Sequence, residues 1–169
     1  MTDYIHDHKM LDDLIEQNIK GRSLFDRLGG RTTLDRVHKI FYDKIYQDSW
    51  MFQYFAHVDQ KIIESKQSDF FSQLTGGPKL YSGRMPLDAH MHINITSELF
   101  DYRHNLLRES LLEAQIPEKE RTEWLNIDLA FRRVLVKISP DQLKKRYNTD
   151  TILDFLPPTA LSISKKAAS

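Results

Sequence analysis

Apolar residues recur along most of this 169-residue chain at intervals of three and four positions, the spacing that places side chains on one face of an α-helix. We find no sustained alternation of apolar and polar residues, and no Asn-Gly or Asp-Gly pair of the kind that favours a tight hairpin. The pattern therefore predicts an all-α fold.

The first segment, at about residues 3–20, predicts an amphipathic helix. Its apolar side chains fall on one side, and such a face has to be covered by the body of the protein or by a second copy of the chain. We therefore treat residues 1–22 as an N-terminal helical extension. The apolar positions are Ile5, Leu11, Leu14, Ile15 and Ile19.

Local signals place the helices that follow. Ser23 heads a short helix with an acid three residues on, and Gly29-Gly30 ends it because glycine accepts left-handed backbone geometry. In the last long helix, Pro117 suits the first turn and Pro140 stops the chain from continuing helically. We expect a loosely ordered tail over 140–169, with a short helix as the alternative for part of it. The main helices are expected at about 32–47 (starting at Thr32 or Thr33), 60–74 (capped by Asp59), 87–92, 96–114 (capped by Thr96) and 117–138.

Composition narrows the function classes. Lys+Arg and Asp+Glu both number 24, so charge gives no reason to expect nucleic acid or an anionic membrane as a partner. The absence of cysteine excludes disulfides, thiolate nucleophiles and cysteine-ligated metals. No secretory signal or membrane-spanning run is visible, and we expect a cytoplasmic protein.

Two histidines one residue apart, His90 and His92, are the first candidates for binding chemistry. On a helix, residues two apart point roughly 200° from each other, so these two cannot share one site as an i,i+4 pair can. Helical spacing groups His90 with Leu87 on the inner face and places His92 outward or at the edge. Partly buried histidines are more often hydrogen-bonded core residues than ligands, so spacing alone leaves both roles open for His90.

Gln67 interrupts an otherwise apolar helical stripe. A buried amide needs hydrogen-bond partners, which are either neighbouring protein groups or a bound ligand. Lys66 beside it is more simply explained as a surface lysine whose stem covers apolar atoms. The stripe consists of Ile63, Gln67, Phe70, Phe71 and Leu74.

Aromatic pairs at Phe41-Tyr42 and Tyr54-Phe55 either pack in the core or line a pocket for a flat apolar cofactor, with the Tyr42 hydroxyl as its polar group. One candidate axial histidine, an aromatic cluster and polar residues on another helix together indicate a haem pocket as a hypothesis.

Four segments resemble one family. SLFDRLGGRTTLDRVHKIFYDKIYQD, YFAHVD, LTGGPKLYSGRMPLDAH and INIT occur in the order typical of the truncated haemoglobins, the short two-over-two globins, and they are most similar to the first group of that family. The resemblance covers roughly Ser23 to Ile138. Several independent motifs agree in register: two Gly-Gly pairs, a Phe-Tyr pair, a Phe-Ala-x-Val-Asp turn, a Tyr-x-Gly-Arg and an Ala-His. It implies a two-over-two helical sandwich over 23–139, with the N-terminal helix and the tail as additions.

The resemblance also implies haem b as the cofactor and assigns roles to particular residues. His90 matches the histidine that coordinates haem iron, which leaves His92 near a propionate or solvent. Tyr42 matches the distal tyrosine whose hydroxyl bonds iron-bound oxygen, and Gln67 matches a distal position that completes this bond. Phe55 matches the phenylalanine packed on the haem plane. Further haem contacts are expected from Phe41 and Phe70.

Two positions depart from the commonest family pattern. Ile63 stands where many relatives have a polar distal residue, so it cannot add a hydrogen bond and instead gates entry. Relatives use the position of Lys66 for a propionate salt bridge, and in some of them the residue there binds iron as a sixth ligand. A lysine must lose its proton to do so, and we favour propionate pairing. Other candidates for contact with a propionate or the haem edge are Lys79, Tyr81 and Arg84.

The resemblance implies reversible binding of dioxygen, with carbon monoxide and nitric oxide as related ligands. Detoxification of nitric oxide to nitrate is our physiological hypothesis, and enzyme activity stays open. Since no flavin or nicotinamide motif is visible, turnover needs a separate reductase. We expect a monomer or a weak homodimer.

Two alternatives remain. One is a six-coordinate haem protein for electron transfer or for scavenging reactive nitrogen and oxygen species, with Lys66 or Tyr42 closing the site. The other is a helical interaction module that has lost haem, against which the intact set of His90, Phe55, Tyr42 and Gln67 argues.

Overall fold

The computed structural model describes Lys9 and residues 22–158, so the predicted N-terminal helix lies outside the described residues. Within them the chain is helical, and its one β-type contact is an isolated bridge between Ile93 and Leu153. No described helix is both long and apolar enough to cross a bilayer. The helices are α2 (Leu24–Leu28), α3 (Arg31–Gln47), η1 (Met51–Tyr54), α4 (Gln60–Leu74), α5 (Pro86–His90), α6 (Ser97–Glu113), α7 (Glu118–Ala130), α8 (Arg132–Leu135) and η2 (Pro140–Gln142).

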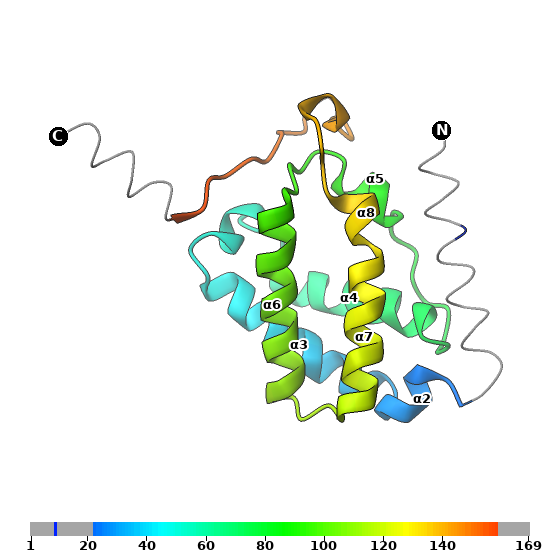
Figure 1. The fold of residues 1–169 in the computed structure, drawn as a ribbon. Coiled ribbons are helices and arrows are strands. Elements are labelled where there is room, and N and C mark those ends of the chain that lie inside the picture. The colour runs from blue at the N-terminus through cyan, green and yellow to red at the C-terminus, as the bar shows by residue number, and fades with distance from the viewer. Residues whose placement is uncertain (1–8, 10–21, 159–169) are drawn as a thin grey trace.

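Two helix pairs form the body of the molecule. Helix α3 packs against α4, α6 packs against α7, and α3 also contacts α6. Figure 1 shows α6 and α7 side by side, crossing over α3 and α4. This arrangement confirms the predicted all-α, two-over-two sandwich.

Three predicted helix starts are confirmed. The side chains of Ser23, Asp59 and Thr96 each accept a hydrogen bond from the backbone N–H three residues on, and each thereby satisfies a donor that the first turn leaves unpaired. Gly29 ends α2 with a φ of 92°, as predicted. The start of α3 was predicted wrongly, because Gly30 and not a threonine is its N-cap residue.

The last long helix is shorter than its apolar spacing predicts. It is interrupted at Phe131, and α8 ends at Leu135 instead of continuing to Ile138. The N–H of Lys137 donates to the carbonyl oxygen of Ile95 at 2.8 Å, so a tertiary hydrogen bond replaces a helical one. Ile138 is consequently 89% exposed and is not part of the core stripe.

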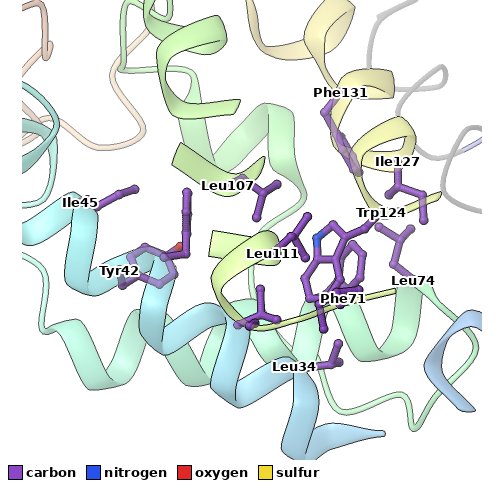
Figure 2. Packing of buried hydrophobic residues seen from close by; sticks show 14 of the residues in the cluster. Leu34, Tyr42, Ile45, Phe71, Leu74, Leu107, Leu111, Trp124, Ile127 and Phe131 are labelled. Atoms are coloured by element: carbon purple, nitrogen blue, oxygen red, sulfur yellow. The ribbon is translucent and has the colours of Figure 1, made fainter. Parts of the chain in front are cut away.

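The core lies where the two helix pairs cross. Trp124 of α7 stacks on Phe71 of α4 with ring centroids 4.1 Å apart, and His38 of α3 meets the Trp124 ring edge-on at 5.6 Å. Figure 2 shows Leu34 and Leu111 beside this pair. Side chains from four helices thus fill the space between the layers, which fixes how α3 and α4 stand relative to α6 and α7.

The described part of the C-terminal segment is hydrogen-bonded to the body as far as Phe155, where a loose tail was expected, and residues 159–169 of the expected tail lie outside the described residues. Leu153 pairs with the stretch before α6, and Phe155 reaches η1. These contacts are made by an extended chain, which has no helical periodicity for a sequence pattern to reveal.

Candidate functional site

His90 is the last residue of α5, a helix of five residues that begins at Pro86. Proline suits this first position because the N–H that it lacks would have had no helical partner. The carbonyl oxygen of Pro86 lies 2.7 Å from Nδ1 of His90. Because a carbonyl only accepts, Nδ1 donates, and the neutral ring keeps its lone pair on Nε2. Burial lowers the pKa of His90 to about 4, so the ring is neutral at physiological pH.

His92 is buried, with 6% of its surface exposed, which corrects the expectation that it points outward or sits at the edge. Helix α5 ends at His90, so helical phase no longer applies two residues later. The N–H of Leu153 donates to the carbonyl oxygen of His92 at 2.9 Å, which brings the C-terminal segment alongside this residue. Its Nδ1 is buried without a hydrogen-bond partner among the described residues.

Tyr42 lies on the buried face of α3, next to Phe41. Its ring meets Phe55 edge-on with centroids 5.8 Å apart, and it meets Phe41 edge-on at 5.1 Å. Burial raises the pKa of Tyr42 well above its usual range, so the hydroxyl stays protonated and can donate. Within the described residues this hydroxyl makes no hydrogen bond to the protein.

Helix α4 brings the other expected distal residues together. Ile63, Gln67 and Phe70 are all half-buried, and the Gln67 amide makes no hydrogen bond within the part of the chain that the structure describes. Phe70 meets the ring of Phe131 at 5.9 Å, so α4 approaches the end of α7 here. Lys66 is exposed and makes no ion pair with a described residue. An exposed lysine fits a propionate partner better than an iron ligand, which must be desolvated to lose its proton.

The three residues proposed to contact the haem edge lie around the loop before α5. Lys79 is exposed and forms no ion pair with a described residue. The hydroxyl of Tyr81 donates to the carbonyl oxygen of Arg84 at 2.6 Å, and its ring meets Phe70 at 5.1 Å. Arg84 donates to the Tyr147 hydroxyl at 2.5 Å, and its guanidinium stands 4.7 Å from the centroid of that ring. Arg84 is therefore bound by Tyr147 of the C-terminal segment.

An ion cluster beneath Phe41 was not assigned a role from the sequence. Nη1 of Arg103 donates to Asp128 at 2.5 Å, and Nδ1 of His104 lies 2.7 Å from the other carboxylate oxygen. Burial alone would raise the pKa of Asp128, but the charge of Arg103 and the hydrogen bonds from His104 and Arg103 hold it below its usual range. The Arg103 guanidinium also stands 5.1 Å from the Phe41 ring centroid. A signal was present, because Arg103 is a charged residue at helical spacing among the apolar residues Phe100, Leu107 and Leu111 of α6.

Arg103 also relates the two sides of the candidate site. Burial is the main influence on both pKa values, raising that of Tyr42 and lowering that of His90. The positive charge of Arg103 lowers both. Tyr42 of α3 and His90 of α5 therefore both stand within electrostatic range of one side chain of α6.

Among residues 22–158, no group of three or more histidine, aspartate, glutamate or cysteine side chains is placed to hold a metal ion. A single neutral histidine with an available nitrogen suits a metal whose remaining ligands come from a cofactor.

The chain belongs to the bacterial-like globin family, whose model matches residues 23–135. A group 1 truncated haemoglobin, GlbN of Synechocystis, is 31% identical over 100 residues, which are 57% of this chain and 81% of that protein. The group 2 truncated haemoglobin 3-1 of Lotus japonicus is 37% identical over 115 residues, which are 64% of this chain and 68% of that protein.

Solved structures agree with this assignment. The truncated haemoglobin of Tetrahymena pyriformis, in its Fe(III) form, superposes with a TM-score of 0.62 at 25% identity, covering 68% of this chain and 98% of that one. The fold is therefore that of the truncated haemoglobins.

The residues of the site fit a haem. The imidazole of His90 is neutral with Nδ1 engaged, as haem and metal ligation through Nε2 requires. Aromatic and aliphatic side chains that the protein buries only in part suit the face of a flat apolar cofactor. They are Phe55, Ile63, Phe70 and Met85.

Proposed function

We propose that this chain is a haem b protein that binds dioxygen reversibly and supports the conversion of nitric oxide to nitrate. The observation that supports it best is the hydrogen bond from Nδ1 of His90 to Pro86, since it leaves a neutral Nε2 for iron. Similar proteins include truncated haemoglobins, and the structure of the Tetrahymena pyriformis protein is of an Fe(III) form. As part of this proposal, residues 23–139 form the globin domain and the protein acts in the cytoplasm.

When bound, haem would supply ferrous iron, which takes up dioxygen and gives up one electron when dioxygen and nitric oxide combine into nitrate. A separate reductase would return that electron. The remaining tasks fall to the chain's own side chains.

Tyr42 and Gln67 would act as donors on the distal side. The Tyr42 hydroxyl is protonated and has no protein acceptor within the described residues, so it can donate to a ligand that gains negative charge. Gln67 stands on the neighbouring helix with its amide likewise unengaged. Phe55 and Ile63 would keep water away from the same side.

The exposure of Lys66 argues against lysine as an iron ligand, because a ligating lysine has to be desolvated to lose its proton. We therefore favour an open sixth position over the six-coordinate alternative. Lys66 and Lys79, both exposed, would instead pair with the propionates.

The test starts from protein purified with an adequate haem supply, reduced and equilibrated with air. We expect an absorption change that reverses when oxygen is removed. After mixing with nitric oxide we expect about one nitrate per haem, a stoichiometry set by the one-electron balance above. Reversible oxygen binding without nitrate would contradict the nitric oxide part alone, and no reversible change would contradict the oxygen part.

A further inference from the structure

The C-terminal segment 143–156, here called the strap, runs beside the chain that follows His90. The N–H of Lys144 donates to the carbonyl oxygen of Met91 and the N–H of Leu153 donates to that of His92, both at 2.9 Å. The N–H of Asn94 donates back to Leu153 at 2.9 Å. The strap thus forms three backbone hydrogen bonds to residues 91–94.

These bonds hold the residues that directly follow α5. A helix leaves its last carbonyl groups without helical partners, and a helix of five residues is too short to be stable alone. The carbonyl oxygen of His90 accepts from Ile93 at 3.0 Å, and the next two carbonyls accept from the strap. The strap therefore supplies hydrogen-bond donors to Met91 and His92, the two residues directly after α5, and fixes the chain where it leaves the helix.

The other end of the strap is fastened to η1. Nε1 of Trp50 donates to the carbonyl oxygen of Phe155 at 2.9 Å. The Tyr54 hydroxyl donates to the same oxygen and accepts from the N–H of Phe155, both at 3.1 Å. The rings of Tyr54 and Phe155 meet edge-on at 5.0 Å. Phe55, which contacts Tyr42, follows directly after η1.

Within the strap, one ion pair fixes the turn between its two ends. Arg146 and Asp150 form a two-point contact, with Nε to Oδ2 at 2.8 Å and Nη2 to Oδ1 at 2.9 Å. The N–H of Arg146 also donates to Oδ2 at 2.8 Å. The strap is therefore cross-linked within itself as well as to both flanks.

We propose that the strap is a positioning element for His90, fixing the backbone after this residue relative to η1 and hence the orientation of its imidazole. Leu153 acts on the His90 side, and Trp50 and Tyr54 are the anchors on the other side. The inference rests on the proposed function, because it takes His90 as the haem ligand. The strap lies beyond residues 23–135, the part that matches the globin family.

The test compares Tyr54→Phe with Tyr46→Phe in the full chain. The first removes both hydroxyl bonds to Phe155 and keeps the ring. The second removes a hydroxyl bond of similar kind, from Tyr46 to the carbonyl oxygen of Val58 at 2.6 Å, and leaves the strap untouched. A Trp50→Phe variant removes the remaining anchor bond.

Two measurements report on the strap. In haem-free protein, amide hydrogen exchange at Asn94 should be about 3- to 10-fold faster in Tyr54→Phe, in keeping with the loss of modest hydrogen bonds. In haem-loaded ferrous protein without added ligand, resonance Raman should show the iron–histidine stretching band shifted or broadened. Trp50→Phe should act in the same direction, and Tyr46→Phe should match the unmodified protein in both measurements.

Faster exchange together with an altered iron–histidine band would support the inference. Faster exchange with an unaltered band would overturn it, because the strap would then be structural only. Unchanged exchange would overturn it as well, since the strap would not depend on its anchor. If the unmodified protein binds no haem, the proposed function fails and the inference fails with it, a result recognised before any variant is compared.

Discussion

Nδ1 of His90 lies 2.7 Å from the carbonyl oxygen of Pro86, one helical turn earlier in α5. This single contact selects the tautomer of His90, fixes the orientation of its ring, and leaves Nε2 as the available nitrogen. The proposed haem ligation depends on it, and so do the expectations for the distal side.

Replacing Tyr42 by Phe should make dioxygen dissociation from the ferrous protein about 10-fold faster or more, since a hydrogen bond to a partly charged ligand is lost. Stopped-flow displacement of oxygen by carbon monoxide measures this rate. The control is Tyr46→Phe, which loses a hydroxyl bonded to Val58 and should behave like the unmodified protein. Equal rates in all three proteins would show that Tyr42 is not the distal donor.

Replacing Lys66 by Ala should leave the ferrous, ligand-free absorption spectrum unchanged, because Lys66 is exposed and is expected to pair with a propionate. Haem transfer to an acceptor globin should be faster by no more than about fivefold, the effect of losing an exposed ion pair. Lys61→Ala, an exposed change on the same helix, provides the control. A low-spin six-coordinate spectrum that Lys66→Ala abolishes would instead establish lysine as an iron ligand.

Replacing Asp128 by Asn should lower the free energy of unfolding by about 3 kcal/mol, because it leaves the mostly buried Arg103 guanidinium without its counter-charge. Asp101→Asn breaks the exposed pair with Arg132 and should cost less than about 1 kcal/mol. Urea denaturation of the haem-free protein gives both values. Equal effects of the two changes would mean that burial does not strengthen the Arg103–Asp128 pair.

His38 should make folding sensitive to acid. It is buried in the core, its Nδ1 lies 2.8 Å from the Ser68 hydroxyl, and burial lowers its pKa to about 3. Between the ordinary value of 6.5 and about 3 the unfolded chain binds the proton and the folded chain does not. The stability contributed by the neutral ring is therefore complete above about pH 6.5 and falls as pH decreases through this window.

A His38→Asn variant keeps a polar atom near Ser68 but cannot titrate. Urea denaturation of the haem-free protein from pH 7 to pH 4 should give a shallower loss of stability for this variant, by up to about 1.4 kcal/mol for each pH unit. Parallel pH profiles for the two proteins would show that His38 does not resist protonation in the folded state.

Sequence patterns predicted the features that depend on neighbouring residues. The caps at Ser23, Asp59 and Thr96 need only a side-chain oxygen and an N–H three positions away, and all three are present. Apolar spacing also predicted a helix at about 32–47, and in the structure Leu34 and Val37 of that helix, α3, are fully buried. Such features are local, so a short window of sequence contains their cause.

Features that depend on distant residues were predicted wrongly or not at all. The last long helix ends early because Lys137 bonds Ile95 across the fold. His92 is buried rather than outward because α5 ends before it and Leu153 pairs with it. Neither partner can be identified from spacing, since each lies more than 40 positions away and makes its contact through the backbone.

The same contrast between local and distant causes applies to the residues of the candidate site. His90 and Tyr42 stand out through motif and helical phase, and the structure gives them the tautomer and the protonation state that their proposed roles need. The hydrogen bond from Arg84 to Tyr147 could not be predicted from the sequence, because Tyr147 lies in a segment outside the family match.

The most direct test of haem ligation by His90 is resonance Raman and absorption spectroscopy of the ferrous, ligand-free protein, with His90→Gly compared against the unmodified chain. We predict a five-coordinate spectrum with an iron–histidine band in the unmodified protein. In His90→Gly that band should be lost, and added imidazole should restore a five-coordinate spectrum. A His90→Gly protein that binds haem with an unchanged spectrum and an unchanged iron–ligand band would contradict ligation by His90. Another residue would then have to be the iron ligand.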